Sequence, residues 1–233
     1  MAINVSAMYV VRNEEEFLPF SIQSIYDAVD EIIVVDNGST DRTVEIAKSF
    51  NKVRLINCNE RGDFAKLRNL ALEAATGKWL LKVDADEIFY PDLAANIKKL
   101  ISDETVDAYT CWFYHLMGDV WHMQNESDFD MRYYRQFLIR NHENLRWVQP
   151  VHEYLQGVGS KIIDSRLQYV HYGYTKHLTY IKEKFKYYEE IEGLVDTVSH
   201  IPAEQILAGR EIKPFNRNHP PVIEQYVQKR IDN

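Results

Sequence analysis

The chain has 233 residues, of which 45% are hydrophobic and 27% are charged, so it is long enough to bury a substantial core in one large domain. Its formal net charge is -8, from 35 acidic and 27 basic residues, and its lysines and arginines form no run. This charge balance disfavours a nucleic-acid partner, because neutralising phosphates requires clustered positive charge.

The chain shows no sign of a targeting or membrane segment. No apolar run approaches the roughly 20 residues that a transmembrane helix needs, and the first strand-like segment follows the initiator methionine without a basic, cleavable leader. We therefore expect a cytoplasmic protein without a transmembrane segment. The two cysteines, Cys58 and Cys111, are too few for a disulfide framework and lack the spacing of metal ligands.

The first hundred residues alternate strand-like and helix-like patterns. A helix with Pro19 in its first turn follows the first strand, and a second helix follows capping candidates at residues 39–41. A third helix is expected to begin at Asp63 and to end at Gly77, and a fourth covers residues 92–101. Strands are predicted at residues 5–11, 31–36, 53–56 and 78–83. Repeated strand–helix units predict an α/β fold with a mainly parallel sheet flanked by helices.

Beyond residue 107 the pattern changes to alternating aromatic segments, at residues 109–114, 133–140 and 162–170. These predict antiparallel or mixed strands that complete the sheet and form a second, mixed-β lobe. Residues 179–194 are amphipathic and predict a helix, and the proline-containing tail predicts an irregular wrap with a short helix. We therefore expect a βα half (1–106), a mixed-strand half of the same domain (107–175), and a C-terminal helix and tail (176–233).

Acidic side chains follow two of the predicted strands. Asp36 follows the second strand, and Asp84 and Asp86 follow the fourth, with the small Ala85 between them. Ligands of open parallel sheets bind beyond the carboxyl ends of the strands, and alternating side chains of extended backbone point the same way. Paired carboxylates suit Mg²⁺ or Mn²⁺, which complete their shell with water and substrate phosphates. An Asp-x-Asp triplet is also a common turn former, and Asp36 fits a turn acceptor as well as a base reader.

Four segments occur in an order and spacing that resemble a known family. They are Val10 to Glu15, Val34 to Asp41, Ala65 to Asn69, and Val83 to Glu87. Together they resemble the family two glycosyltransferases, inverting enzymes of GT-A (Rossmann-like) fold, and the resemblance covers about the first ninety residues strongly. It implies a UDP-sugar donor and a bound Mn²⁺ or Mg²⁺.

A second stretch resembles one subgroup of that family. Arg132 to Arg135, followed by Trp147 to Glu153, resembles the subgroup with a Val-His-Glu segment that includes relatives of lipopolysaccharide core glucosyltransferases. Tyr134 stands where that subgroup usually has Phe. The resemblance implies that residues 1–106 bind the nucleotide-sugar and that residues 107–175 meet the acceptor.

The resemblance implies roles for the nucleotide-binding residues. Asp36 would accept a hydrogen bond from the nucleobase, beside the backbone around Val11 and Arg12. Arg68 would face the diphosphate, whereas Lys66 fits a solvated helix face better.

The resemblance also implies which residues hold the metal. Asp86 would ligate the cation directly, and Asp84, beside Ala85, would approach the ribose or the metal. His152 would be a second ligand or a diphosphate contact, with a structural histidine as the alternative, and His171 competes with it for the ligand role.

Inverting transfer needs an acceptor nucleophile activated on one face of the sugar and a leaving diphosphate stabilised on the other. The cation serves the second requirement and a carboxylate the first. We assign the base to Glu153, with Asp119, Asp128 and Asp130 as alternatives.

We therefore expect a hexosyltransferase that moves a hexose or N-acetylhexosamine. The acceptor is a glycan, a lipid-linked saccharide or a peptide, and the sequence does not choose among these or indicate an oligomeric state. A nucleotidyltransferase is a rival class, although Arg12-Asn13-Glu14 stands where a glycine-rich phosphate loop would be expected. A non-catalytic nucleotide-sugar-binding protein is the other rival.

Overall fold

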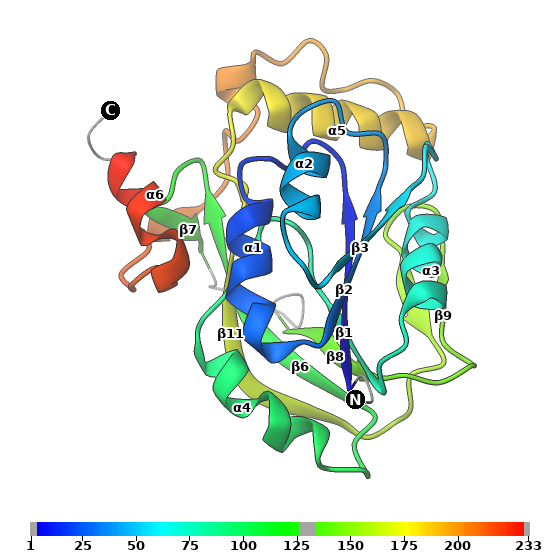
Figure 1. The fold of residues 1–233 in the computed structure, drawn as a ribbon. Coiled ribbons are helices and arrows are strands. Elements are labelled where there is room, and N and C mark those ends of the chain that lie inside the picture. Colours follow the sequence, from blue (N-terminus) through cyan, green and yellow to red (C-terminus); the bar gives the residue numbers. More distant parts are fainter. Residues whose placement is uncertain (1–3, 126–133, 231–233) are drawn as a thin grey trace.

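The computed structural model of the chain describes residues 4–125 and 134–230. Over these residues, ten strands form one sheet and two more form a small separate sheet, with helices around them (Figure 1). The helices are α1 (Leu18–Ile25), α2 (Thr43–Lys48), α3 (Phe64–Ala74), α4 (Asp92–Ile101), α5 (Leu178–Glu192) and α6 (Glu224–Lys229). The strands are β1 (Val5–Val11), β2 (Glu31–Asp36), β3 (Val53–Asn57), β4 (Trp79–Lys82), β5 (Glu87–Phe89), β6 (Ala108–Met117), β7 (His122–Gln124), β8 (Tyr134–Arg140), β9 (Arg146–Val148), β10 (Tyr154–Gln156), β11 (Ile162–Tyr174) and β12 (Ile212–Pro214).

The first four strands form a parallel unit in the order β3, β2, β1, β4. Val11 lies opposite Asp36, which lies opposite Asn57, so the carboxyl ends of three strands are level. Met8 lies opposite Lys82 at the end of β4. The loops that follow β1, β2 and β4 therefore meet at one edge of the sheet, and the predicted parallel α/β unit is confirmed.

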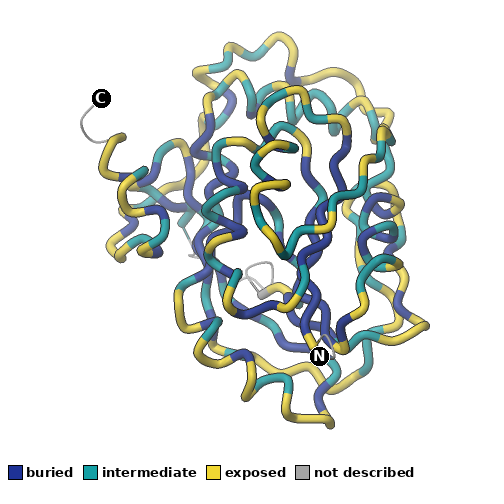
Figure 2. Tube along the Cα trace, viewed as in Figure 1, coloured by how far each residue is buried: buried dark blue, intermediate teal, exposed yellow. Residues whose placement is uncertain are grey.

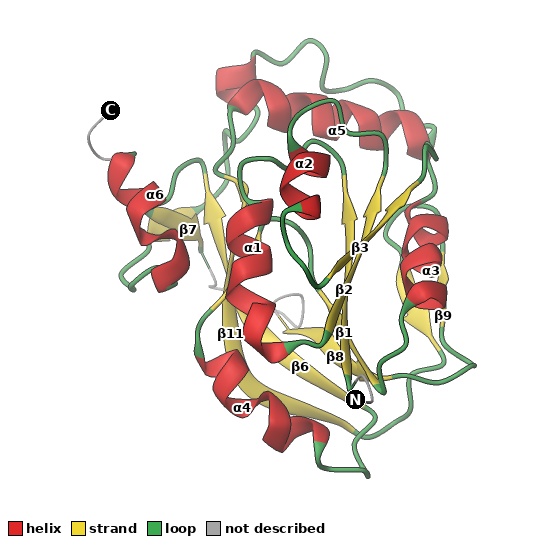
Figure 3. Cartoon of the chain, in the orientation of Figure 1, coloured by secondary structure: helices red, strands yellow, loops and turns green. Residues whose placement is uncertain are grey.

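The later strands extend the same sheet. β8 runs antiparallel to both β4 and β6, and β11 runs parallel to β6 and antiparallel to β5. β7 and β12 continue the sheet at its edge, next to α6 (Figure 3). The predicted mixed strands are therefore present as a continuation of the parallel unit.

The two faces of the sheet are covered by different helices, because strand side chains alternate between faces. On β1 and β2, Tyr9 and Val34 pack with α1 and α4, whereas Met8 and Val35 pack with α3. The most buried segments are the central strands and the inner faces of these helices (Figure 2). Two layers of helices thus fix the strands whose ends carry the acidic residues.

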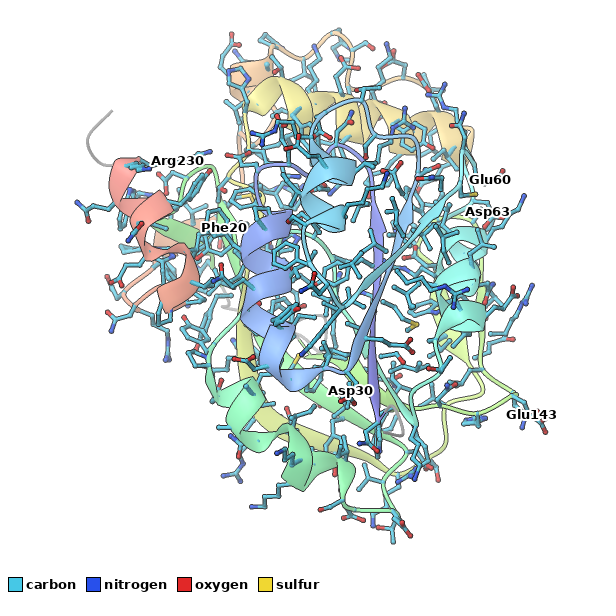
Figure 4. The ribbon with its side chains drawn as sticks, in the orientation of Figure 1. Phe20, Asp30, Glu60, Asp63, Glu143 and Arg230 are labelled. Carbon is cyan, nitrogen blue, oxygen red and sulfur yellow. The ribbon has the colours of Figure 1, made fainter. Side chains whose placement is uncertain are left out.

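Two of three predictions about helix ends are confirmed, and the third is wrong. Asp63 caps α3 by accepting a hydrogen bond from the Lys66 amide at 2.8 Å, as predicted, and lies with Glu60 at the amino-terminal end of that helix (Figure 4). Pro19 is in the first turn of α1, also as predicted. Gly77 does not end α3: the helix stops at Ala74, and Ala75 is already extended.

The predicted C-terminal helix is α5, which ends at Gly193 in the left-handed conformation. It lies across the carboxyl-end side of β1, β2 and β3 (Figure 1). The tail then follows the predicted irregular path to the short helix α6. Within the described ranges, no helix combines the length and apolarity that crossing a membrane requires.

Candidate active site

A cleft of ≈ 1090 Å³ opens where the carboxyl ends of the parallel strands meet α5. Its walls come from the loops after β1, β2 and β4, the start of α3, His115 of β6, the segment from Trp147 to Leu155, the end of β11, and α5. Asp84, Ala85 and Asp86 all line this cleft, as the position of the triplet at a strand end predicts.

Asp84 is surrounded by three cationic side chains. Its Oδ1 accepts a hydrogen bond from Arg68 Nη2 at 3.0 Å, and its Oδ2 accepts from Lys82 Nζ and Arg135 Nη1, each at 3.2 Å. Burial alone would raise the pKa of Asp84, but the charges of Lys82, Arg68 and Arg135 outweigh it and hold the pKa well below its usual range. Asp84 is therefore an ionised carboxylate with a fixed orientation.

Arg68 connects Asp84 to Glu153. Its Nε donates to Glu153 Oε1 at 2.5 Å, while Nη2 binds Asp84. The side chains of Arg68 and Glu153 are 13% and 15% exposed, so solvent screens the pair little. One guanidinium thus orients a carboxylate of the triplet and the predicted base.

Glu153 reaches the cleft because α3 holds the segment before it. The Asn69 amide accepts from the Trp147 backbone nitrogen and donates to the Trp147 carbonyl, both at 2.9 Å. The Phe64 amide donates to the Pro150 carbonyl at 2.8 Å. These bonds span about eighty residues of sequence and fix the loop that carries Glu153.

Asp86 lies next to His171 of β11. The distance from Asp86 Oδ1 to His171 Nε2 is 3.4 Å, and Tyr172 N donates to the Asp86 carbonyl at 2.8 Å. The space between them depends on Gly173, where a Cβ would lie 2.5 Å from Asp86 Oδ2 and 2.8 Å from His171 Cε1. The ring of His115 stacks on His171, with centroids 4.6 Å apart.

Asp86 is also ionised. Burial would raise its pKa, but His171, and then the more distant Lys184 and Lys176, lower the pKa far below the ordinary value of an aspartate. Among the side chains that the structure describes, no three of His, Cys, Asp or Glu gather closely enough to hold a metal ion on their own.

The C-terminal segment contributes charged and aromatic groups on the same side of the cleft. Lys176 is 4% exposed and binds Glu14 Oε2 at 2.5 Å, and Tyr180 OH donates to Glu14 Oε1 at 3.2 Å. Burial would lower the pKa of Lys184, but the neighbouring Tyr188, Asp86 and Glu14 outweigh it, so the pKa is raised and the ammonium stays charged. α5 therefore supplies positive charge beside Asp86.

Of the residues predicted for the nucleobase, Val11 and Arg12 line the cleft, whereas Asp36 is buried and, unlike its neighbour Asn37, is not among the lining residues. Asp36 is 5% exposed and accepts hydrogen bonds from the amides of Gly38 at 3.2 Å and Ser39 at 3.3 Å, which is the turn geometry considered as the alternative. Val11 is buried, and Arg12 is exposed; both line the cleft. The nucleobase roles of these residues remain predictions.

The two histidines considered as metal ligands have different surroundings in the structure. His152 is 82% exposed, has a left-handed backbone (φ 56°), and binds Glu192 Oε1 at 2.8 Å, whereas His171 adjoins Asp86. Lys66 pairs with Glu60 on the solvated face of α3, as expected.

Of the alternative bases, Asp119 binds His122 and is not among the residues that line the cleft. Asp128 and Asp130 lie outside the described residues.

Charged residues of the site that had no role assigned from the sequence include Glu14, Lys82, Arg135, Lys176 and Lys184. A signal for Lys184 existed. Tyr180, Lys184 and Tyr188 recur every four residues, which places them on one face of α5, and Lys176 lies just before that helix. What the pattern could not show is that this face covers the cleft.

The model of Glycosyl transferase family 2 matches residues 6–163, which is more than half of the sequence. The chain belongs to glycosyl transferase family 2. The family assignment made from the sequence motifs is thereby confirmed, and the segment from Val10 to Glu87 that carried it lies inside the matched range.

Relatives of this glycosyltransferase domain are longer than the regions they share with it. A TPR repeat-containing protein of Synechococcus elongatus is 33% identical over 151 residues, which are 64% of this chain and 34% of that protein. The uncharacterized glycosyltransferase YibD of Escherichia coli is 35% identical over 98 residues, 39% of this chain and 28% of the relative. The chain thus matches about a third of the length of these relatives.

Solved structures resemble about half of the chain. Staphylococcus aureus TarS, in complex with UDP-GlcNAc, is 24% identical with a TM-score of 0.45, over 49% of this chain and 36% of the other. Mycobacterium tuberculosis glucosyl-3-phosphoglycerate synthase, in complex with Mn²⁺ and UDP-glucose, is 24% identical with a TM-score of 0.41, over 48% of this chain and 44% of the other.

Proposed function

We propose that this chain is an inverting, metal-assisted glycosyltransferase that moves a hexose or N-acetylhexosamine from a UDP-sugar to a saccharide, lipid-linked or polypeptide acceptor. The observation that carries the proposal is the pairing of Asp86 with His171 at the floor of a cleft, beside an Asp84 that Arg68 links to Glu153. Family membership supplies the reaction class, and the arrangement of these side chains supplies the roles.

The side chains beside Asp86 fit a divalent cation. A carboxylate oxygen and an imidazole nitrogen 3.4 Å apart are donors that suit Mn²⁺, and Gly173 keeps the space between them clear. The Nδ1 atom of His171 is buried without a hydrogen-bond partner among the described residues, so the stacked ring of His115, with centroids 4.6 Å apart, orients the imidazole. We therefore assign the two protein ligands to Asp86 and His171, in preference to His152.

A cation held by these residues would supply Lewis-acid stabilisation to the departing diphosphate. The protein's own part is to hold Asp86 ionised and to orient His171. Asp84 is fixed by Arg68, Lys82 and Arg135 and would approach the ribose of the donor. Glu153 accepts the proton of the acceptor hydroxyl as that oxygen attacks the anomeric carbon.

The first test is Asp86→Ala. Sugar release from UDP-glucose, UDP-galactose and UDP-N-acetylhexosamines is measured with and without Mn²⁺, for the wild type, for Asp86→Ala, and for Asp119→Ala as a control whose aspartate lies away from the cleft. We expect the Mn²⁺-dependent release to be lost in Asp86→Ala alone, with its melting transition retained. Full activity in that variant would defeat the metal assignment.

The second test is Glu153→Gln, which keeps the shape of the side chain and removes its basicity. We expect UDP binding to be retained while transfer falls by about 100-fold or more, the usual contribution of a general base. Unchanged transfer would move the base to another carboxylate, such as Asp128 or Asp130, which lie outside the described residues.

The same assay separates the rival classes. A nucleotidyltransferase would form pyrophosphate, and a non-catalytic binding protein would bind the UDP-sugar and release nothing. The absence of a glycine-rich phosphate loop after β1, where Arg12-Asn13-Glu14 stands, supports the glycosyltransferase.

A further inference from the structure

Lys184 on α5 lines the same cleft as Asp86, and the charges of the two side chains interact. It is partly buried, and among the described residues no hydrogen bond or ion pair engages its ammonium group. An ammonium held away from bulk water without a partner is costly, so such a group in a cleft indicates an anion that joins it.

Among the described residues, the other cations whose charges lower the pKa of Asp84 or Asp86 each have an anionic partner. Arg68 binds Asp84 and Glu153, Arg135 binds Asp84 and Glu87, and Lys82 binds Asp84. Lys176, the other lysine that lowers the pKa of Asp86, forms an ion pair with Glu14 at 2.5 Å. Within this group of described cations, Lys184 is the one whose hydrogen bonds are still available.

We propose that Lys184 binds the diphosphate group of the nucleotide-sugar donor and stabilises the charge that develops on it during transfer. This inference rests on the proposed function, because it takes Asp86 as the residue that would hold the cation. A diphosphate beside Asp86 meets the Lys184 ammonium, and the three donors of that group fit phosphate oxygens.

In the transfer step, the bond between the anomeric carbon and the diphosphate oxygen breaks, and its electron pair stays on the diphosphate. The acceptor oxygen bonds to the anomeric carbon and its proton goes to Glu153. Lys184 keeps its proton throughout and donates hydrogen bonds to the departing oxygen atoms. The C-terminal segment thereby completes a site whose other parts come from the first ninety residues and from β11.

A purely structural role makes a different prediction. If Lys184 only offset the charges of Asp86 and Glu14, its removal would change the stability of the protein, and ligands with and without phosphate would be affected alike. A diphosphate contact instead changes affinity in proportion to the phosphates that the ligand carries.

The experiment is titration calorimetry with MnCl₂ present, using UDP, UMP and uridine as probes, on the wild type, Lys184→Met, Lys184→Arg and Lys182→Met. We expect Lys184→Met to weaken UDP binding by about ten- to hundred-fold, the worth of a hydrogen bond to a charged group, with uridine binding unchanged. Lys184→Arg should restore part of the loss. Lys182→Met is the matched control, because Lys182 is on the same helix but binds the Ser199 carbonyl at 2.9 Å.

Equal UDP affinity in wild type and Lys184→Met would overturn the proposal, as would an equal loss for UDP and uridine. If Lys184→Met does not fold, the wild type decides: UDP should slow acetylation of Lys184, read by mass spectrometry, and leave Lys182 unaffected, and absence of protection contradicts the assignment. If the wild type binds none of the nucleoside diphosphates UDP, ADP, GDP and dTDP, the proposed function fails together with this inference. Wild-type UDP binding with an unaffected Lys184→Met would end this inference alone.

Discussion

At the scale of single residues, Arg68 determines the geometry of the cleft. It is the common partner of Asp84 and Glu153, and all three side chains are less than one third exposed. Removing it leaves the largely buried Glu153 without its cationic partner and leaves Asp84 with Lys82 and Arg135 alone.

We therefore predict that Arg68→Met lowers the free energy of unfolding by about 3 kcal/mol, the cost of removing one partner from a buried ion pair, and reduces transfer strongly. Urea denaturation and the sugar-release assay measure the two effects. Lys66→Met, two residues earlier on α3, is the matched control, because Lys66 is 58% exposed and should change stability by about 0.5 kcal/mol at most. If both variants were equally stable and active, Arg68 would have no organising role.

The position of the acidic triplet could be predicted from the sequence, but the histidine that lies next to Asp86 could not. Asp84 and Asp86 follow a strand whose pattern is readable, and their direction follows from the alternation of β structure. The neighbour of Asp86 depends instead on the pairing of β11 with β5, in which His171 lies opposite Glu87 across 84 residues of sequence. His152 was favoured because it adjoins Glu153 in the chain, yet its side chain turns to Glu192 at the end of α5.

At the scale of elements, one carboxylate joins β2 to β1 and to the segment before β4, at the end of the sheet opposite the cleft. Glu31 at the start of β2 accepts hydrogen bonds from Ser6 of β1 and from the amide and hydroxyl of Thr76, the latter two at 2.7 and 2.8 Å. Gly77 donates to Ser6 Oγ at 2.7 Å, and a Cβ on Gly77 would lie 2.6 Å from that oxygen. The close approach of two strands, rather than the end of a helix, explains the glycine, and helix-end rules from sequence do not reveal it.

This junction should make stability depend on pH. Burial would raise the pKa of Glu31, but the hydrogen bonds from Ser6 and Thr76 outweigh it, so the pKa is lower in the folded protein than in the unfolded chain. A carboxylate with a depressed pKa contributes stability above the unfolded pKa of about 4.3 and loses it as the pH falls through the folded value.

We predict that Glu31→Gln costs about 1 kcal/mol at pH 7, since the carboxylate is partly solvated, and that the difference from wild type shrinks below about pH 4. Urea titrations at pH 7 and pH 3.5 measure it. Glu45→Gln serves as the control, because the Arg42–Glu45 pair is exposed, and little change is expected at either pH. A cost that stays constant or grows at pH 3.5 would contradict the assigned role of Glu31.

At the scale of the whole molecule, most of the fold was predictable because its signals are local. The buried apolar run of the first strand, the Asp63 cap and the helix of residues 92–101 with its apolar face are all contained in short windows, and the structure bears them out. The order of β6, β8 and β11 in the sheet depends on pairings between distant segments, which no window contains. The position of α5 over the cleft likewise depends on contacts between distant segments, so it could not be predicted from the sequence.

The cleft takes Asp86 from the loop after β4, His171 from β11 and Lys184 from α5. Under the proposed function, a donor with its cation would contact all three, so donor binding would depend on the whole chain. A ligand that binds the folded state alone stabilises it by about 2.7 kcal/mol at 100 times its dissociation constant. For a chain of this size, we predict that UDP with Mn²⁺ at that concentration raises the melting temperature by about 5–10 °C.

Scanning calorimetry measures this shift, and Asp86→Ala provides the control, since it should lose the Mn²⁺-dependent part. The shape of the transition carries a second result. Because α5 shares contacts with Glu14, Phe64 and His152, we expect residues 176–230 to unfold together with the sheet in one transition that the ligand moves as a unit. Two transitions, with the ligand moving one of them, would mean that the C-terminal segment unfolds independently and takes no part in the nucleotide site.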